Sequence, residues 1–113
     1  MSFYLAINNV QTNISVHTAK NIFEYFKGLS DRELPLDNEG MLLRWTKEIQ
    51  MKTCKIPLDI IFVNSKGVIK DLYQDVLPKS KNRFSLFGIH CFELPTGTIA
   101  NFNLKKGDVL SLK

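Results

Sequence analysis

The segment from Leu58 to Leu77 constrains the fold of this chain more than any other part of the sequence. Leu58 to Val63 is a nearly continuous apolar run, and residues 64–67, Asn-Ser-Lys-Gly, favour a tight turn directly after it. Gly67 can adopt a positive φ in that turn, and Val68 to Leu77 then returns as a second, longer strand. The sequence therefore predicts a β-hairpin.

Other segments show the short apolar or alternating pattern of strands, separated by clusters of Gly, Pro, Asn, Asp and Ser. The expected strands are Phe3–Ile7, Ile14–Thr18, Met41–Trp45, Ile49–Thr53, Ile89–Leu94 and Val109–Leu112, with an exposed basic loop over Pro78–Ser85 and an irregular or briefly helical crossing over Gly97–Leu104. No alternation of strands with helices supports a parallel sheet. We expect an antiparallel, partly closed sheet.

One segment has a helical period. Ala19, Ile22, Phe23 and Phe26 recur at the spacing that lines one face of a helix, which predicts a helix near residues 19–27. The length of 113 residues suits one domain over residues 1–113, and 44% hydrophobic with 23% charged residues are ordinary globular values. The expected fold class is α+β: a compact, mostly antiparallel, barrel-like β domain with one main amphipathic helix packed on it.

Charge and cysteine content limit the function classes. The net charge of +4 is spread along the chain, so it favours anionic partners only slightly. Neither a signal segment nor a membrane-spanning run is visible, so we expect a cytoplasmic protein with no membrane partner. Cys54 and Cys91 are expected to be reduced, packed thiols, and we expect no metal site and no cofactor. The oligomeric state stays open.

Asp59 is the most informative polar residue, because a period of two places it among apolar side chains of a buried strand. A buried carboxylate needs a cation or several N–H donors, since its desolvation is costly. Two interpretations follow. Asp59 is either a structural carboxylate that holds a turn or loop, or it forms the floor of a polar pocket together with a cation. The available cations are Arg32, Arg44, Lys52 and Lys55.

Other residues could also carry chemistry. Glu93 lies in the strand before Pro95, and with Asp59 it would supply the two carboxyl groups that acid–base hydrolysis requires. A basic loop containing Lys79, Lys81 and Arg83 precedes Phe84 and could contact phosphates, although a solvated loop is the usual meaning of such a run. We therefore do not expect nucleic-acid binding.

Three groups of motifs, in order along the chain, resemble the family called domain of unknown function 192, or uncharacterised ACR. They are Lys27-Gly28-Leu29 with Arg32; Gly40-Met41-Leu42-Leu43 with Met51-Lys52 and Ile56-Pro57-Leu58-Asp59-Ile60-Ile61-Phe62; and Phe92-Glu93-Leu94-Pro95-Thr96-Gly97 with Lys106-Gly107-Asp108-Val109. The chain departs from the family pattern at residues 50–54, Gln-Met-Lys-Thr-Cys, where relatives typically show Trp-Met-Lys-Asn-Thr, and at Ser30, where Met is typical.

The resemblance implies a compact, barrel-like β domain with a flanking helix and no assigned activity. Many relatives look exported. From the residues and the resemblance together, we expect a small binding module for a small polar or anionic ligand. Its pocket candidates are Arg32, Met51, Lys52, Asp59 and Glu93. The alternatives are a hydrolase-like enzyme that uses Asp59 and Glu93, and a protein-interaction domain; whether the chain is an enzyme stays open.

Overall fold

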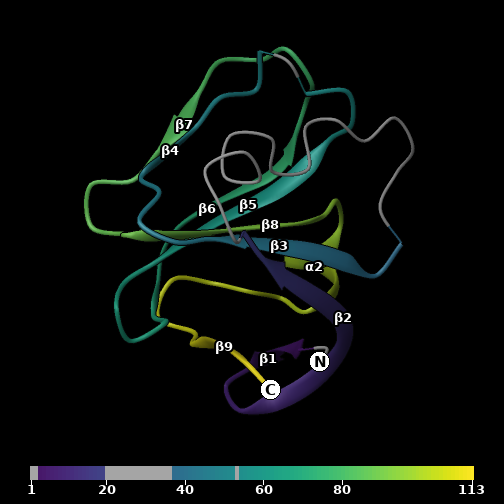
Figure 1. The fold of residues 1–113 in the computed structure, drawn as a ribbon, viewed down its shortest axis with the longest axis vertical. Helices are drawn as coiled ribbons and strands as arrows, with labels where there is room; N and C mark the ends of the chain where they lie inside the picture. The colour runs from purple at the N-terminus through teal and green to yellow at the C-terminus, as the bar shows by residue number, and fades with distance from the viewer. Residues whose placement is uncertain (1–2, 20–36, 53) are drawn as a thin grey trace.

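The structure is a computed structural model that describes residues 3–19, 37–52 and 54–113. Within these ranges, nine strands and one short helix follow each other along the chain (Figure 1). The elements are β1 (Phe3–Ile7), β2 (Val10–Thr18), β3 (Glu39–Leu43), β4 (Glu48–Ile49), β5 (Leu58–Val63), β6 (Ile69–Val76), β7 (Arg83–Phe84), β8 (His90–Pro95), α2 (Thr98–Asn101) and β9 (Leu110–Leu112).

Seven of these strands form one curled sheet in the order β6-β5-β8-β3-β2-β1-β9. The two edge strands are tied together at one end, because Val68 and Val109 form an antiparallel bridge. Two backbone hydrogen bonds flank that bridge: Leu110 N–H to Gly67 O at 2.8 Å and Ile69 N–H to Asp108 O at 2.8 Å. The sheet is therefore a partly closed, barrel-like structure, as its alternating strands predicted.

The β5–β6 hairpin forms where the sequence predicts it. The two strands pair antiparallel, and Gly67 has a φ of 81° in the turn between them. Asn64 fixes the turn, since its side-chain oxygen accepts the backbone N–H groups of Lys66 and Val68, each at 2.9 Å. The hairpin prediction is confirmed.

The sheet is buried on both faces around β5, and all six residues of that strand are buried. Alternate residues of β5 enter two separate hydrophobic clusters, which explains why its sequence is apolar throughout rather than alternating. Ile61 and Val63 pack in the first cluster with Phe92 and Leu110. On the opposite face, the second cluster holds Ile60 and Phe62 with residues such as Met41, Met51, Cys54 and Cys91.

The expected α+β class is wrong. Strands make up 52% and helix only 4% of the residues that the structure describes, so the domain is mostly β. The predicted helix near residues 19–27 lies outside the described residues except for Ala19. The helix that is described, α2, is a single turn inside the predicted irregular crossing. The chain has many strand segments and only one segment of helical period, so strands dominate the part that the structure describes.

Two pairings also differ from the expected topology. β2 and β3 pair in parallel, although no strand–helix alternation indicated a parallel pair. β7 lies within the expected basic loop and pairs with β4 in a separate two-stranded sheet. Both pairings join segments that are distant in sequence, and local residue patterns carry no information about such partners.

Candidate functional site

Asp59 is buried in β5, with 1% of its surface exposed, and its carboxylate binds backbone N–H groups. One oxygen accepts the N–H of Asp75 in β6 at 2.8 Å, and the other accepts the N–H of Ile99 in α2 at 2.8 Å. In the described part of the chain, no cation lies within ion-pair distance of this carboxylate. The geometry supports the structural interpretation of Asp59: it ties the end of β6 and the start of α2 to the central strand.

Glu93 lies on the other face of the sheet. In β5 and β8, Asp59 pairs with Leu94 while Ile60 pairs with Glu93, so the two carboxylates alternate to opposite sides. Glu93 is only 4% exposed and faces the second hydrophobic cluster, near Cys54 and Cys91. The structure therefore does not bring Asp59 and Glu93 together as an acid–base pair.

The two cysteines are buried, free thiols on the Glu93 side of the sheet. Burial raises the pKa of Cys54 to about 11, and the negative charge of Glu93 adds to that rise. Burial also raises the pKa of Cys91, again with a contribution from Glu93. Neither thiol has the lowered pKa of a nucleophile, which fits the expectation of packed thiols. No cluster of metal-ligating side chains occurs among the residues searched, which are the described ones.

The remaining predicted pocket residues are dispersed. Met51 is fully buried in the second hydrophobic cluster, whereas Lys52 is exposed to solvent. Arg32 lies outside the described residues. Among the described candidates, Met51 and Glu93 therefore lie on one side of the sheet and Asp59 on the other, so these residues do not form one pocket that includes Asp59.

Several residues of the family-like motifs have structural roles of their own. Gly40 lies so close to β8 that a Cβ atom there would be 2.6 Å from Leu94 Cδ2 and 3.1 Å from Glu93 O. Asp108 accepts the backbone N–H of Lys105 at 3.1 Å and the side-chain amide of Asn8 at 3.2 Å. These two hydrogen bonds, that from Asn8 foremost, lower the pKa of Asp108. Motif residues such as these stabilise the fold rather than mark a site.

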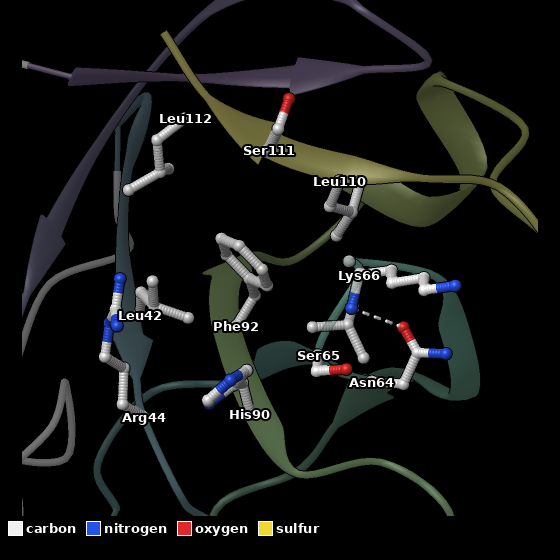
Figure 2. Close-up of a pocket in the computed structure, with 12 residues that line it drawn as sticks. Leu42, Arg44, Asn64, Ser65, Lys66, His90, Phe92, Leu110, Ser111 and Leu112 are labelled. Carbon is white, nitrogen blue, oxygen red and sulfur yellow. Dashed lines mark hydrogen bonds between the residues drawn. The ribbon is translucent and has the colours of Figure 1, made fainter.

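A groove of about 340 Å³ opens at the end of the barrel where the sheet edges meet (Figure 2). Its apolar lining comes from four strands, β3, β5, β8 and β9, and Figure 2 shows Phe92 between the leucine side chains. The apolar residues are Leu42, Val63, Phe92, Leu110 and Leu112, and the polar ones are Arg44, Asn64, Ser65, Lys66, His90 and Ser111. None of the predicted pocket residues that the structure describes, namely Met51, Lys52, Asp59 and Glu93, lines it.

Strand register explains why Arg44 and His90 meet at one end of this groove. Leu42 pairs with Phe92 on the groove side, and a period of two carries that face on to Arg44 and His90. Lys66 lines the groove from the β5–β6 turn, on the side opposite Arg44 in Figure 2, where its ammonium group extends away from Phe92. Within the described ranges, neither Arg44 nor Lys66 has a carboxylate within ion-pair distance. The groove therefore combines an apolar floor with two cations at its ends.

The ring of His90 is held in a defined orientation. Its Nδ1 accepts the backbone N–H of Trp45 at 3.0 Å, which leaves the Nε2 position for the proton of the neutral ring. The Trp45 ring packs edge-on against it with centroids 4.8 Å apart. Partial burial lowers the pKa of His90, and the positive charge of Arg44 lowers it further. His90 is thus a neutral hydrogen-bond donor beside a permanent cation at neutral pH.

Sequence reasoning missed this groove although it identified some of its parts. Arg44 appeared only as a possible partner of Asp59, and Lys66 only as a turn residue. The groove forms because β9 closes over the β5–β6 turn, a contact between segments more than forty residues apart. The alternation of Leu42 with Arg44 and of Phe92 with His90 was the available signal, but it does not reveal which strands are neighbours.

These features define a class of protein: a small curled β domain, partly closed at one end, with a cation-flanked apolar groove at that end. The chain belongs to the family named domain of unknown function 192, uncharacterized ACR, whose family model matches residues 4–112. The resemblance seen in the sequence is confirmed. No curated protein matches the sequence.

Two solved structures share the fold. One is a protein from Sinorhizobium meliloti 1021 named "putative transcription regulator", with 24% identity and a TM-score of 0.82 over 98% of this chain and 92% of that chain. The other is a protein of unknown function from Novosphingobium aromaticivorans DSM 12444, with 22% identity and a TM-score of 0.81 over 97% of this chain and 83% of that one. At these identities the likeness establishes the fold alone.

Proposed function

We propose that this protein is a binding module for a small anion that carries an apolar body, held in the groove between β3, β8 and β9. The observation that carries the proposal is the lining of the groove: an apolar floor with a cation at each end that, among the described residues, has no carboxylate within ion-pair distance. A volume of about 340 Å³ is at the small end of the roughly 300–1,000 Å³ of known ligand pockets. The ligand class is therefore a small carboxylate or phosphate rather than a polymer.

Each part of the ligand has a partner in this arrangement. Arg44 offers the planar donor group that suits carboxylate and phosphate oxygens, and the neutral His90 ring adds an N–H donor next to it. Phe92 and Leu110 supply apolar surface for the body of the ligand. Lys66 contributes a second positive charge across the groove, which raises the local concentration of anions.

The hydrolase alternative receives no support from the geometry, because Asp59 and Glu93 lie on opposite faces of the sheet. Asp59 also has both carboxylate oxygens occupied by backbone N–H groups. The proposal therefore retains the expected small anionic ligand but moves its site from the Asp59 region to the groove.

The test is an NMR titration of the 15N-labelled protein with benzoate, phenyl phosphate and inorganic phosphate, with benzyl alcohol as the uncharged probe. We expect saturable shifts centred on Arg44, Lys66 and His90 for the anions with a ring, and weaker ones for the other two probes. An Arg44→Gln variant should bind about 10-fold more weakly or worse, which is the effect of losing one charged hydrogen bond.

Lys79→Gln is the matched control, because it removes the same charge from an exposed side chain that does not line the groove. It should bind as the unmodified protein does. Equal weakening in both variants would show that the anions respond only to net charge. Shifts that map away from the groove would also contradict the proposal.

A further inference from the structure

The loop after β7 exposes large apolar side chains at its tip. We call residues 84–88, Phe-Ser-Leu-Phe-Gly, the apolar loop. Leu86 and Phe87 are 72% and 74% exposed, and Phe84 is 57% exposed, while Ser85 between them is buried. In Figure 1 this loop is the leftmost bend of the ribbon, beside the chain that leads from β3 to β4. Trp45 on that neighbouring segment is 71% exposed.

The apolar loop is held by its own hydrogen bonds rather than left loose. Lys47 Nζ donates to the carbonyl oxygens of Leu86 at 2.8 Å and Gly88 at 2.6 Å. Ser85 Oγ accepts the Gly88 N–H at 2.8 Å and donates to the carboxylate of Asp71. A loop that packs Ser85 inward and holds Leu86 and Phe87 outward presents apolar side chains with several backbone groups already satisfied. Such a tip can enter an apolar medium at reduced cost, since unpaired backbone groups are penalised there.

The charge next to the apolar loop is positive. Lys47 sits at its base and, in the described part of the chain, has no carboxylate within ion-pair distance; the same holds for Arg44 beside Trp45. Acidic groups near the loop have partners of their own: Asp71 lies 3.8 Å from the ammonium of Lys106, and Glu48 accepts a hydrogen bond from Asn82.

A further cation precedes the loop. Arg83 is the residue before Phe84, and its guanidinium lies over the Tyr73 ring, 5.9 Å from the centroid. Tyr73 in turn donates its hydroxyl to the carbonyl oxygen of Phe84 at 2.6 Å. The rim of the loop therefore carries an excess of cations next to exposed rings.

We propose that the apolar loop is a membrane-contact element that docks on anionic phospholipid surfaces. Leu86 and Phe87 would enter the boundary between headgroups and acyl chains, while Lys47, Arg44 and Arg83 would stay at the level of the phosphates. Trp45 would lie at the interface, where indole rings are favoured.

Peripheral contact of this kind needs no spanning segment, and among the described residues no helix is long and apolar enough to cross a bilayer. The proposal differs from the expectation of no membrane partner. That expectation considered only signal segments and membrane-spanning runs, not peripheral contact through a loop. It does not depend on ligand binding in the groove.

The test uses the single tryptophan of the chain, Trp45, as the reporter. The full chain is mixed with vesicles of phosphatidylcholine alone or with 30% phosphatidylserine, and emission and co-sedimentation are measured. We expect a blue shift and co-sedimentation with the anionic vesicles, both decreasing when NaCl is raised from 50 to 500 mM. Binding to neutral vesicles should be at least 5-fold weaker.

The decisive variant is Leu86→Ser/Phe87→Ser, which should lower the partition coefficient on anionic vesicles at least 5-fold. Its matched control is Val10→Ser/Phe102→Ser, which removes two exposed apolar side chains elsewhere and should partition like the unmodified chain. Thermal melts confirm that both variants are folded. No binding to either vesicle type, equal binding to both, or an equal loss in the two variants would overturn the proposal and leave the apolar loop to a protein partner.

Discussion

Replacing Asp59 with Asn tests the interpretation of the central carboxylate. The change keeps one acceptor oxygen but places an amide NH₂ against one of the two backbone N–H groups, both of which now donate at 2.8 Å. It removes one charge-assisted hydrogen bond, worth about 1.5–3 kcal/mol, and leaves a buried N–H group unpaired, which costs about 1–3 kcal/mol. We expect the free energy of unfolding to fall by about 3 kcal/mol in all.

For a domain of this size, that loss corresponds to a decrease of about 12 °C in Tm, at about 4 °C per kcal/mol. Urea unfolding followed by circular dichroism measures the free energy, and a thermal scan measures the Tm. Asp37→Asn is the matched control, because it removes the same charge from an exposed side chain and should change stability by less than about 0.5 kcal/mol.

An Asp59→Asn protein that unfolds within about 0.5 kcal/mol of the unmodified one would refute the reasoning. The two backbone hydrogen bonds would then contribute little, and the buried carboxylate would need another explanation. A pocket role would be supported only if the same variant also lost ligand binding in the titration above.

Two further predictions follow from the fold. Gly67→Ala should destabilise the protein by about 3 kcal/mol in urea unfolding, because Gly67 has a φ of 81° and a Cβ atom there would lie 2.2 Å from Leu110 O. The control Gly107→Ala, at a φ of 100° with no atom within 4 Å of the added Cβ, should lower the free energy of unfolding by only about 1–2 kcal/mol. Equal losses in the two variants would show that the contact with β9 is unimportant. Cys54, whose pKa is raised to about 11, and the buried Cys91 should react with a thiol reagent at pH 8 far more slowly in the native protein than in guanidinium; fast native labelling would contradict their burial.

The parts of the fold that the sequence predicted are those determined by neighbouring residues. The β5–β6 hairpin depends on an apolar run, a turn with Gly67, and a returning strand, all within twenty residues. The burial of Asp59 followed from period two in the same way. Its partners did not, because the donors are backbone N–H groups of Asp75 and Ile99, and every residue but proline carries such a group.

The candidate site depends even more than the fold on contacts between distant segments, which local sequence patterns do not predict. Arg44, Lys66 and His90 meet only because β3, β8 and the β5–β6 turn are brought under β9. The motif residues that attracted attention in the sequence have their roles in the fold, as Gly40 and Asp108 show. Motifs thus identified the family correctly and include two lining residues of the groove, Leu42 and Phe92, but they did not indicate its cations.

The pairing of β1 with β9 has a consequence for biosynthesis. Leu5 lies opposite Leu112, and Tyr4 and Lys113 exchange two backbone hydrogen bonds at 2.7 and 2.9 Å. While the polypeptide is emerging from a ribosome, β1 can pair with β2 but has an open edge until some hundred residues later. Contacts of such long range are slow to form, so this strand would be available to chaperones or to a neighbouring nascent chain in the interval.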